Sequence, residues 1–230
     1  MKASSLPSPR AAFSLVELLV VCSIIAVIVG LTIPAANTLI RGSAMTQGAS
    51  MVNDQISLAR GLALSRNRPV EVRFYKFADP ETPGEDKKNE ETWKFRALQT
   101  LEILENGAAI PMGKVQYLPN NVVMNDGALS TLLDDRVRGE LKKPGGPDPE
   151  LPRDVKKDYK FYSFRFLQDG STDLPLKTSG SSTNERRWYL TLQALTDNIS
   201  KESKTPPPNF FTLQIDPITG ATKSYRPNAG

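Results

Sequence analysis

The carboxylate of Glu17 lies at the start of a run that otherwise suits lipid. Residues 18–40 contain no charged side chain. A charge at the centre of a bilayer costs roughly 2.5–3.5 kcal/mol even on lenient insertion scales. A carboxylate in this setting is therefore expected to do one kind of chemistry, which is to pair its charge with a nearby cation.

Other residue types restrict the chemistry further. The chain contains no histidine and a single cysteine, Cys22. The absence of histidine excludes Ser-His-Asp and Cys-His nucleophile systems and histidine-ligated metals. A lone cysteine forms neither an internal disulfide nor a cysteine-rich metal site, so we expect Cys22 to pack as a small apolar residue. We predict no cofactor, no metal site and no enzymatic activity.

Acidic pairs are the next candidates for chemistry. Asp134–Asp135 and Glu90–Glu91 lie in polar, turn-rich runs, which favours solvated loops over an acid–base pair or a cation site. Residues 169–173 lack the ligand spacing and the terminal glutamate of a calcium loop, so a hairpin turn explains them better. No glycine-rich phosphate loop occurs.

Two basic groups are candidates for binding nucleic acid. One surrounds the predicted end of a long helix and consists of Arg60, Arg66, Arg68 and Arg73. The other is Arg186 and Arg187 beside Trp188, where cations could hold phosphates and an aromatic ring could stack on bases. The alternative is an ordinary mixed-charge surface with Trp188 in the core. We favour it because, without Lys2 and Arg10, the chain carries 27 basic and 25 acidic residues.

The element that carries Glu17 follows a short basic leader, residues 1–12. The apolar run 13–40 has 28 residues, or about 42 Å as a helix. It is too long for the apolar region of a secretory signal peptide and exceeds the roughly 20 residues that span a bilayer. A plain signal anchor fits the length but leaves Glu17 unexplained. We predict a transmembrane or filament-core helix over 13–40.

The run Ala12-Phe-Ser-Leu-Val-Glu17 resembles the processing motif of type IV prepilins and pseudopilins. The resemblance implies that prepilin peptidase, which is also the N-methyltransferase, cuts between Ala12 and Phe13 and methylates the new amine of Phe13. It makes Glu17 the motif glutamate and Pro34 the proline that commonly kinks these helices. Ala12 departs from the family pattern, which usually has glycine before the cut.

This processing would supply the missing cation. The freed amine of Phe13 would lie one helical turn from Glu17, on the same face. Glu17 could pair with its own N-terminus in the membrane, or with the N-terminus of a neighbouring subunit in a filament. The alternative is that Glu17 lies at headgroup level and snorkels.

Residues 41–230 are expected to form an α+β domain with a pilin-like fold. Helical spacing puts one apolar face on the sheet, formed by Met45, Ala49, Val52, Ile56, Ala59 and Ala63. The long helix should be kinked near Pro34 and Gly42 and end near Ser65, ahead of Pro69.

The rest of this domain is predicted to be an antiparallel sheet under that helix. Alternation and turn residues predict strands at 70–77, 93–104, 115–118, 122–124, 161–167, 188–195, 210–215 and 221–225. In the second strand we expect one side to carry Trp93, Phe95, Ala97, Leu101 and Ile103. Residues 125–158 read as a loop insertion or exposed loop with a short helix around 129–138.

Residues 57–72, 164–170 and 216–220 are also similar to H-type minor pseudopilins and FimT-like minor pilins, and the layout resembles the Verru_Chthon cassette protein D family. The resemblance implies a non-catalytic subunit of a type II secretion or type IV pilus-like filament. Its partners would be prepilin peptidase, other pilin or pseudopilin subunits, and the lipid bilayer.

The distribution of charge predicts the topology. Lys2 and Arg10 precede the apolar run, which favours a cytoplasmic N-terminus, a single pass through the inner membrane and a periplasmic domain. After assembly the domain would be in a filament or at the cell surface. Two alternatives stay open: a signal-anchored extracytoplasmic binding domain that does not polymerise, and a DNA-binding minor pilin.

Overall fold

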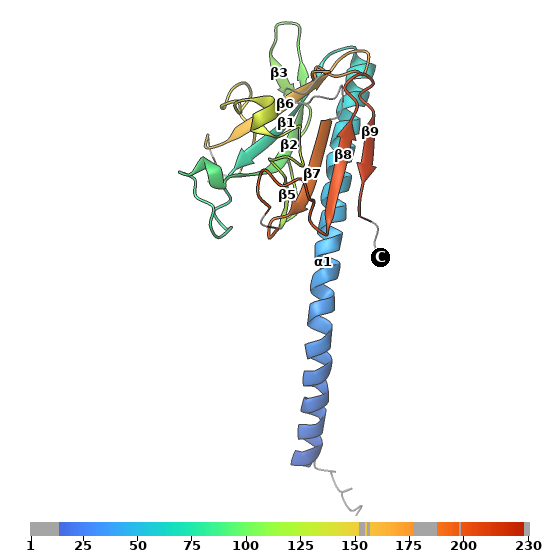
Figure 1. The fold of residues 1–230 in the computed structure, drawn as a ribbon, viewed down its shortest axis with the longest axis vertical. Coiled ribbons are helices and arrows are strands. Elements are labelled where there is room, and N and C mark those ends of the chain that lie inside the picture. Colours follow the sequence, from blue (N-terminus) through green and yellow to red (C-terminus); the bar gives the residue numbers. More distant parts are fainter. Residues whose placement is uncertain (1–13, 152–154, 156, 177–187, 198, 228–230) are drawn as a thin grey trace, which may run out of the picture. The chain divides into compact units, whose positions relative to one another are not determined.

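The computed structural model describes residues 14–151, 155, 157–176, 188–197 and 199–227, except for the side chains of residues 30–41. The chain divides into two compact units, residues 1–40 and 41–230. Helix α1 (Leu15–Arg66) contributes its first part to one unit and its second part to the other. We describe each unit separately (Figure 1).

In the first unit, α1 starts with a capped turn. The side-chain oxygen of Ser14 accepts a hydrogen bond from the backbone nitrogen of Glu17 at 3.2 Å, and the Ser14 carbonyl accepts one from Leu18 at 3.1 Å. These bonds satisfy donors that a helix start leaves without partners, and they explain why α1 begins at Leu15. Among the described residues, none of the helices combines the length and apolar character that crossing a bilayer requires.

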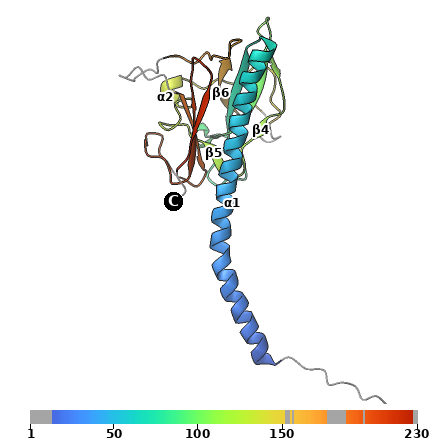
Figure 2. The ribbon, with the colours of Figure 1, turned by 90° about the vertical axis from the view of Figure 1, so that its right-hand side faces the viewer.

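In the second unit, residues 41–66 of α1 lie along the sheet (Figure 2). The predicted apolar face is confirmed, since each of its members is buried in one core with the sheet: Met45, Ala49, Val52, Ile56, Ala59 and Ala63. The helix ends at Arg66 because Asn67 takes a left-handed conformation (φ 51°) just before Pro69. The kink expected near Pro34 and Gly42 stays a prediction.

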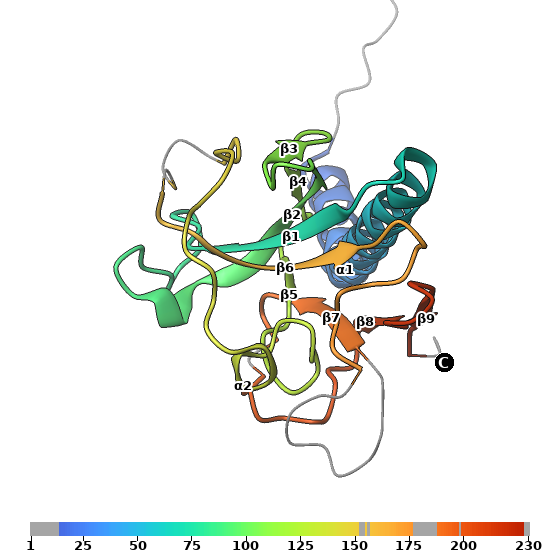
Figure 3. The same ribbon diagram turned by 90° about the horizontal axis from the view of Figure 1, so that it is seen from above.

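The described strands form one antiparallel sheet in the order β6-β1-β2-β5-β7-β8-β9, with β3 and β4 also paired to β2. In Figure 3, β6, β1 and β2 run to the left of residues 41–66 of α1, and β7, β8 and β9 lie below that part of the helix. The strand bounds are β1 Val70–Phe77, β2 Lys94–Ile103, β3 Ala109–Pro111, β4 Gln116–Tyr117, β5 Val122–Met124, β6 Lys160–Phe166, β7 Trp188–Ala194, β8 Phe210–Ile215 and β9 Thr222–Tyr225. The predicted α+β class is confirmed, and only β3 was not anticipated.

A bulge in β2 overturns the face predicted for that strand. Tyr75 pairs with Ala97, but the next residue, Lys76, pairs with Phe95, so Arg96 is an extra residue. Because one extra residue reverses the alternation, Phe95 lies in the core against α1 whereas Ala97 lies in a second cluster with Tyr75. The prediction that one side of this strand carries Trp93, Phe95, Ala97, Leu101 and Ile103 is therefore wrong.

The segment 125–158 is irregular, as expected, but its first part is not an exposed loop. The short predicted helix is present as α2 (Asp135–Arg138). Before it, Ser130, Leu132 and Leu133 are buried. This stretch continues along the edge of β7 beyond the end of β5: the Leu132 nitrogen donates to the Tyr189 carbonyl at 3.0 Å, and Ser130 accepts from the Thr191 nitrogen at 2.7 Å.

The later part of the same segment covers polar side chains of β1. Arg73 is buried under Gly145, whose carbonyl accepts a hydrogen bond from it at 3.2 Å. Gly146 approaches so closely that an added Cβ would lie 3.4 Å from the Arg73 guanidinium. A second apolar cluster lies on this side of the sheet and includes Tyr75, Val155, Tyr159 and Phe161.

Candidate functional site

The first candidate site is the start of α1, where Ser14 and Glu17 meet. The run Ser-x-x-Glu is a capping-box pattern, in which the serine caps the helix and the glutamate occupies the third helical position. The Glu17 carboxylate also lies in the first turn, where the helix dipole favours negative charge. Sequence reasoning missed this local role of Glu17, although the spacing from Ser14 was the available signal.

The other residues of the predicted processing and assembly site are Ala12, Phe13 and Pro34. Ala12 and Phe13, the two processing residues, lie outside the described residues, and so does the side chain of Pro34. Glu17 itself is exposed. The pairing of Glu17 with the Phe13 amine, in the same chain or in a neighbour, therefore stays a prediction.

Around Glu17 the surface of α1 is apolar on every side. All described side chains from residue 14 to residue 29 are exposed, among them Leu15 at 79 % and Val29 at 47 %. Cys22 is exposed too, so it does not pack within this chain. Soluble monomers rarely expose a continuous apolar patch of this size. We therefore expect the apolar side chains in the first part of α1 to be buried against lipid or against another molecule.

The basic group near the end of α1 is engaged in internal contacts. Arg66 and Arg68 both pair with Glu102, at 2.6 and 3.2 Å. Arg73 pairs with Glu71 at 2.5 Å, and Arg60 donates to the backbone carbonyls of residues 170 and 219 at 3.4 and 3.1 Å. Each of these arginines therefore has a partner within the fold, and the side chains of Arg66 and Arg68 remain 47 % and 42 % exposed.

The second basic group lies at the start of β7. Trp188 is only 1 % exposed, which confirms the interpretation that it is a core residue. Arg186 and Arg187 lie outside the described residues.

The acidic pairs have structural roles. Asp134 is buried, caps α2 by accepting from the Arg136 nitrogen, and pairs with the Arg136 side chain at 2.7 Å. The expectation of a solvated loop is therefore wrong for Asp134, because a helix cap and an ion pair compensate its burial. Glu90 is exposed and pairs with Lys160. The turn expected at residues 169–173 is confirmed by Gly170, which has φ 81°, and by the Ser171–Asp169 hydrogen bonds.

A buried ion group on β1 was not anticipated. Glu71 accepts from Arg73 and, at 3.1 Å, from Arg165. Burial raises the pKa of Glu71, but hydrogen bonds from the two arginines and the charge of Arg73 outweigh that effect and hold the pKa below its ordinary value. The alternating pattern of β1 had identified only the apolar side of the strand.

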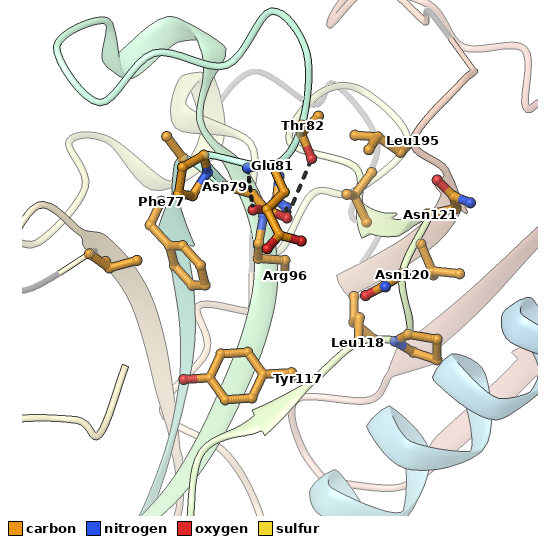
Figure 4. A pocket seen from close by; sticks show the side chains of 16 residues that line it. Phe77, Asp79, Glu81, Thr82, Arg96, Tyr117, Leu118, Asn120, Asn121 and Leu195 are labelled. Atoms are coloured by element: carbon orange, nitrogen blue, oxygen red, sulfur yellow. Dashed lines mark hydrogen bonds and ion pairs between the residues drawn. The ribbon is translucent and has the colours of Figure 1, made fainter. Parts of the chain in front are cut away.

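A second candidate site is a cleft of about 640 Å³, which we call the Glu81 cleft (Figure 4). One wall is the end of β1 and the following turn, residues 77–82. The opposite wall is residues 117–123, and Arg96, Val155 and Leu195 complete the lining. Sequence reasoning missed it because the β2 bulge, which defines the position of Arg96, has no local signature.

Comparison with known protein families bears on the N-terminal part of the chain. Residues 7–33 match the family model "Prokaryotic N-terminal methylation motif". No curated protein matches the chain.

Two solved structures are distantly similar. One is the minor pseudopilin EpsH of the Vibrio cholerae type 2 secretion system, with 10% identity and a TM-score of 0.40, covering 80% of this chain and 98% of that one. The other is the type IV minor pilin FimU of Pseudomonas aeruginosa, with 11% identity and a TM-score of 0.39, covering 80% and 92%. On the match at residues 7–33, the N-terminal part of the chain carries the prokaryotic N-terminal methylation motif.

Proposed function

We propose that this chain is a minor pilin or pseudopilin, a non-catalytic structural subunit of a type IV pilus-like or type II secretion filament. Prepilin peptidase cuts it between Ala12 and Phe13 and methylates the Phe13 amine. The first part of α1 then packs among the helices of other pilin or pseudopilin subunits. The observation that carries the proposal is the methylation motif at residues 7–33, which contains Glu17.

The exposed apolar surface of α1 supports an assembled state. Between residues 15 and 29 the helix presents large apolar side chains: Leu15, Val16, Leu18, Leu19, Val20, Val21, Ile24, Ile25, Val27, Ile28 and Val29. A helix that is apolar all round is stable only when lipid or other helices cover it. Before assembly the cover would be the inner membrane, with the N-terminus cytoplasmic and residues 41–230 periplasmic; in the filament it would be neighbouring subunits.

Glu17 would then act in assembly through its charge. The Ser14 cap holds the first turn, so the carboxylate starts from a defined position. A buried carboxylate without a partner costs several kcal/mol, and a neighbour's N-terminal ammonium in contact with it offsets much of that cost. The pairing would favour the register in which each Glu17 meets the next subunit's Phe13.

Processing is tested by the N-terminus of the protein. The full chain is produced with a prepilin peptidase, extracted from membranes and examined by intact mass and N-terminal sequencing. We expect a chain that begins at a methylated Phe13. A chain that still begins at Met1, or one cut well after Phe13, would contradict the proposal, whereas cleavage without methylation would contradict only its second step.

Assembly is tested separately with Cys22, the only cysteine of the chain. Any disulfide or thiol crosslink that forms through Cys22 must join two molecules, and Cys22 is exposed on the apolar helix. We expect oxidation of cells that carry the filament machinery to trap dimers, and Cys22→Ser to abolish them. If dimers are equally abundant without the machinery, the chain associates in the membrane without assembling, as a signal-anchored binding domain could.

A further inference from the structure

The Glu81 cleft has walls of unequal charge. Its lining contains two carboxylates, Asp79 and Glu81, and one cation, Arg96. The Arg96 guanidinium is already neutralised, since it pairs with Asp79 at 3.0 Å and with Glu85. Its Cζ atom also lies 5.8 Å from the centre of the Phe77 ring. The charge of Arg96 is therefore balanced inside the fold by two carboxylates, while its buried Nε atom has no hydrogen-bond partner among the described residues.

Glu81 is the second carboxylate in the lining of the cleft. Its side chain is exposed at the cleft and makes no ion pair with any residue that the structure describes. Its backbone nitrogen donates to Asp79 at 3.0 Å, which fixes the turn that carries it. Asp79 and Glu85 thus pair with the Arg96 guanidinium, and the Glu81 carboxylate adds an unpaired negative charge to the lining of the cleft. An anionic ligand would be repelled here, and a cationic one attracted.

The facing wall supplies an aromatic ring and two amides. Tyr117 is 40 % exposed, its ring packs edge-on against Phe77 at 6.5 Å, and its hydroxyl donates to the Glu150 carbonyl at 3.0 Å. Since the hydroxyl is engaged, the ring is what Tyr117 offers to a ligand. Asn120 and Asn121 are exposed at the tip of this wall, and Asn121 is held with φ 68° while its carbonyl accepts from Leu195 at 2.8 Å.

We propose that the Glu81 cleft binds a basic peptide segment of a partner protein. A lysine or arginine side chain of that segment lies between the Glu81 carboxylate and the Tyr117 ring, where an ion pair and a cation–π contact act together. The Asn120 and Asn121 amides face the backbone of the peptide. A volume of about 640 Å³ suits a segment of a few residues, since it lies within the usual range of ligand sites.

Every residue that lines the cleft lies in residues 41–230, so a binding test at the cleft requires neither cleavage before Phe13 nor assembly through the first part of α1. Failure of this proposal would leave the proposed function untouched.

The test is calorimetric titration of the full chain in a neutral detergent with tetralysine as the probe. Tetraglutamate and tetraserine are the comparison peptides. We expect tetralysine alone to bind, and its binding to weaken as salt rises from about 0.05 to about 0.5 M, because screening shortens the reach of exposed charges. No binding of tetralysine, or equally tight binding of tetraserine or tetraglutamate, would overturn the proposal.

The decisive comparison is between two acids of the same charge. We expect Glu81→Gln to raise the dissociation constant of tetralysine about fivefold, which corresponds to one exposed ion pair of about 1 kcal/mol. Glu91→Gln, in the exposed helical turn Glu90–Thr92, should leave it unchanged. Equal weakening by both variants would show that tetralysine senses only overall charge and would refute a site at the cleft.

A second variant tests the aromatic wall. We expect Tyr117→Leu to weaken tetralysine binding about threefold, the size of a modest cation–π contact. Tyr117→Phe, which keeps the ring and loses only the bond to Glu150, should bind as the original does. The melting temperature of the Tyr117→Leu protein shows whether it is folded. Unchanged tetralysine binding by the folded variant would show that the Tyr117 ring is not part of the site.

Discussion

The side-chain oxygen of Ser14 accepts a hydrogen bond from the backbone nitrogen of Glu17 at 3.2 Å. This bond makes the helix begin beside the glutamate of the methylation motif. The two residues are thus linked in structure: Ser14 caps the start of α1, and Glu17 carries the charge that assembly is proposed to use.

Glu17→Ala separates processing from assembly. We expect the variant to be cleaved before Phe13 at the normal rate, because the Ser14 cap accepts a backbone donor and survives the change. Assembly should fall at least about tenfold, since losing one well-formed buried charge pair costs more than 1.4 kcal/mol. The measurements are N-terminal sequencing and the yield of Cys22 crosslinks.

The matched control is Ser14→Ala, which retains the carboxylate. Loss of a helix cap costs about 1 kcal/mol, so the first turn of α1 should exchange its amide hydrogens faster while crosslinks persist. If Glu17→Ala assembles as well as the unmodified chain, the carboxylate only snorkels, and the assembly role assigned to it is wrong.

Glu71→Gln tests the buried ion group on β1. The change leaves Arg73 buried without its main counter-charge. We expect the free energy of unfolding to fall by about 3 kcal/mol, as for other broken buried pairs. Urea unfolding of the full chain in detergent measures it. Glu91→Gln, at an exposed position, should change this free energy by less than about 0.5 kcal/mol.

The pH dependence follows from the same groups. The pKa values of Glu71 and Asp126 are lowered in the folded state: burial raises each, but Arg73 outweighs it at Glu71 and Lys76 at Asp126. A carboxyl whose folded pKa is depressed stabilises the fold above its unfolded pKa and loses that contribution as pH falls through the folded pKa. Stability should therefore drop below about pH 4.5.

Between about pH 6 and pH 8 the stability should be nearly flat, because the chain has no histidine to titrate there. Melting temperatures across this range provide the measurement. In Glu71→Gln the acid-side drop should be smaller than in the original chain. A drop of the same size in both proteins would assign the acid sensitivity to other carboxyls.

Gly220→Ala tests the junction between the last hairpin and the turn after β6. Gly220 has φ 64°, and an added Cβ would lie 2.1 Å from the carbonyl oxygen of Gly170. Since both strain and overlap act, we expect a loss of about 2–3 kcal/mol in the free energy of unfolding.

Gly61→Ala is the matched control for Gly220→Ala. Gly61 lies in α1, and an added Cβ would meet nothing within 4 Å. The change should stabilise the chain by up to about 1 kcal/mol through helix propensity. Equal effects of the two substitutions would show that the close approach at Gly220 is relieved by a backbone shift.

Local sequence patterns determined much of this fold. The α1 face from Met45 to Ala63 follows helical spacing, and Val70, Val72 and Phe74 alternate on β1; both sets are buried in one core. Such patterns are readable because burial of one face requires a fixed period, 3.6 residues in a helix and 2 in a strand. The methylation motif is equally local, since its residues are contiguous in the chain.

The tertiary structure alone decided three features. The bulge at Arg96 depends on the pairing of β2 with β1. The burial of Leu132 depends on the edge of β7 that β5 leaves unpaired. The Glu81 cleft is formed by segments that lie far apart in the chain. Each arises where distant segments meet, so no local pattern encodes it. The charge of Glu17 is local and is therefore readable from the sequence, whereas the partner proposed for it, a processed N-terminus, depends on cleavage and assembly and is not encoded in a local pattern.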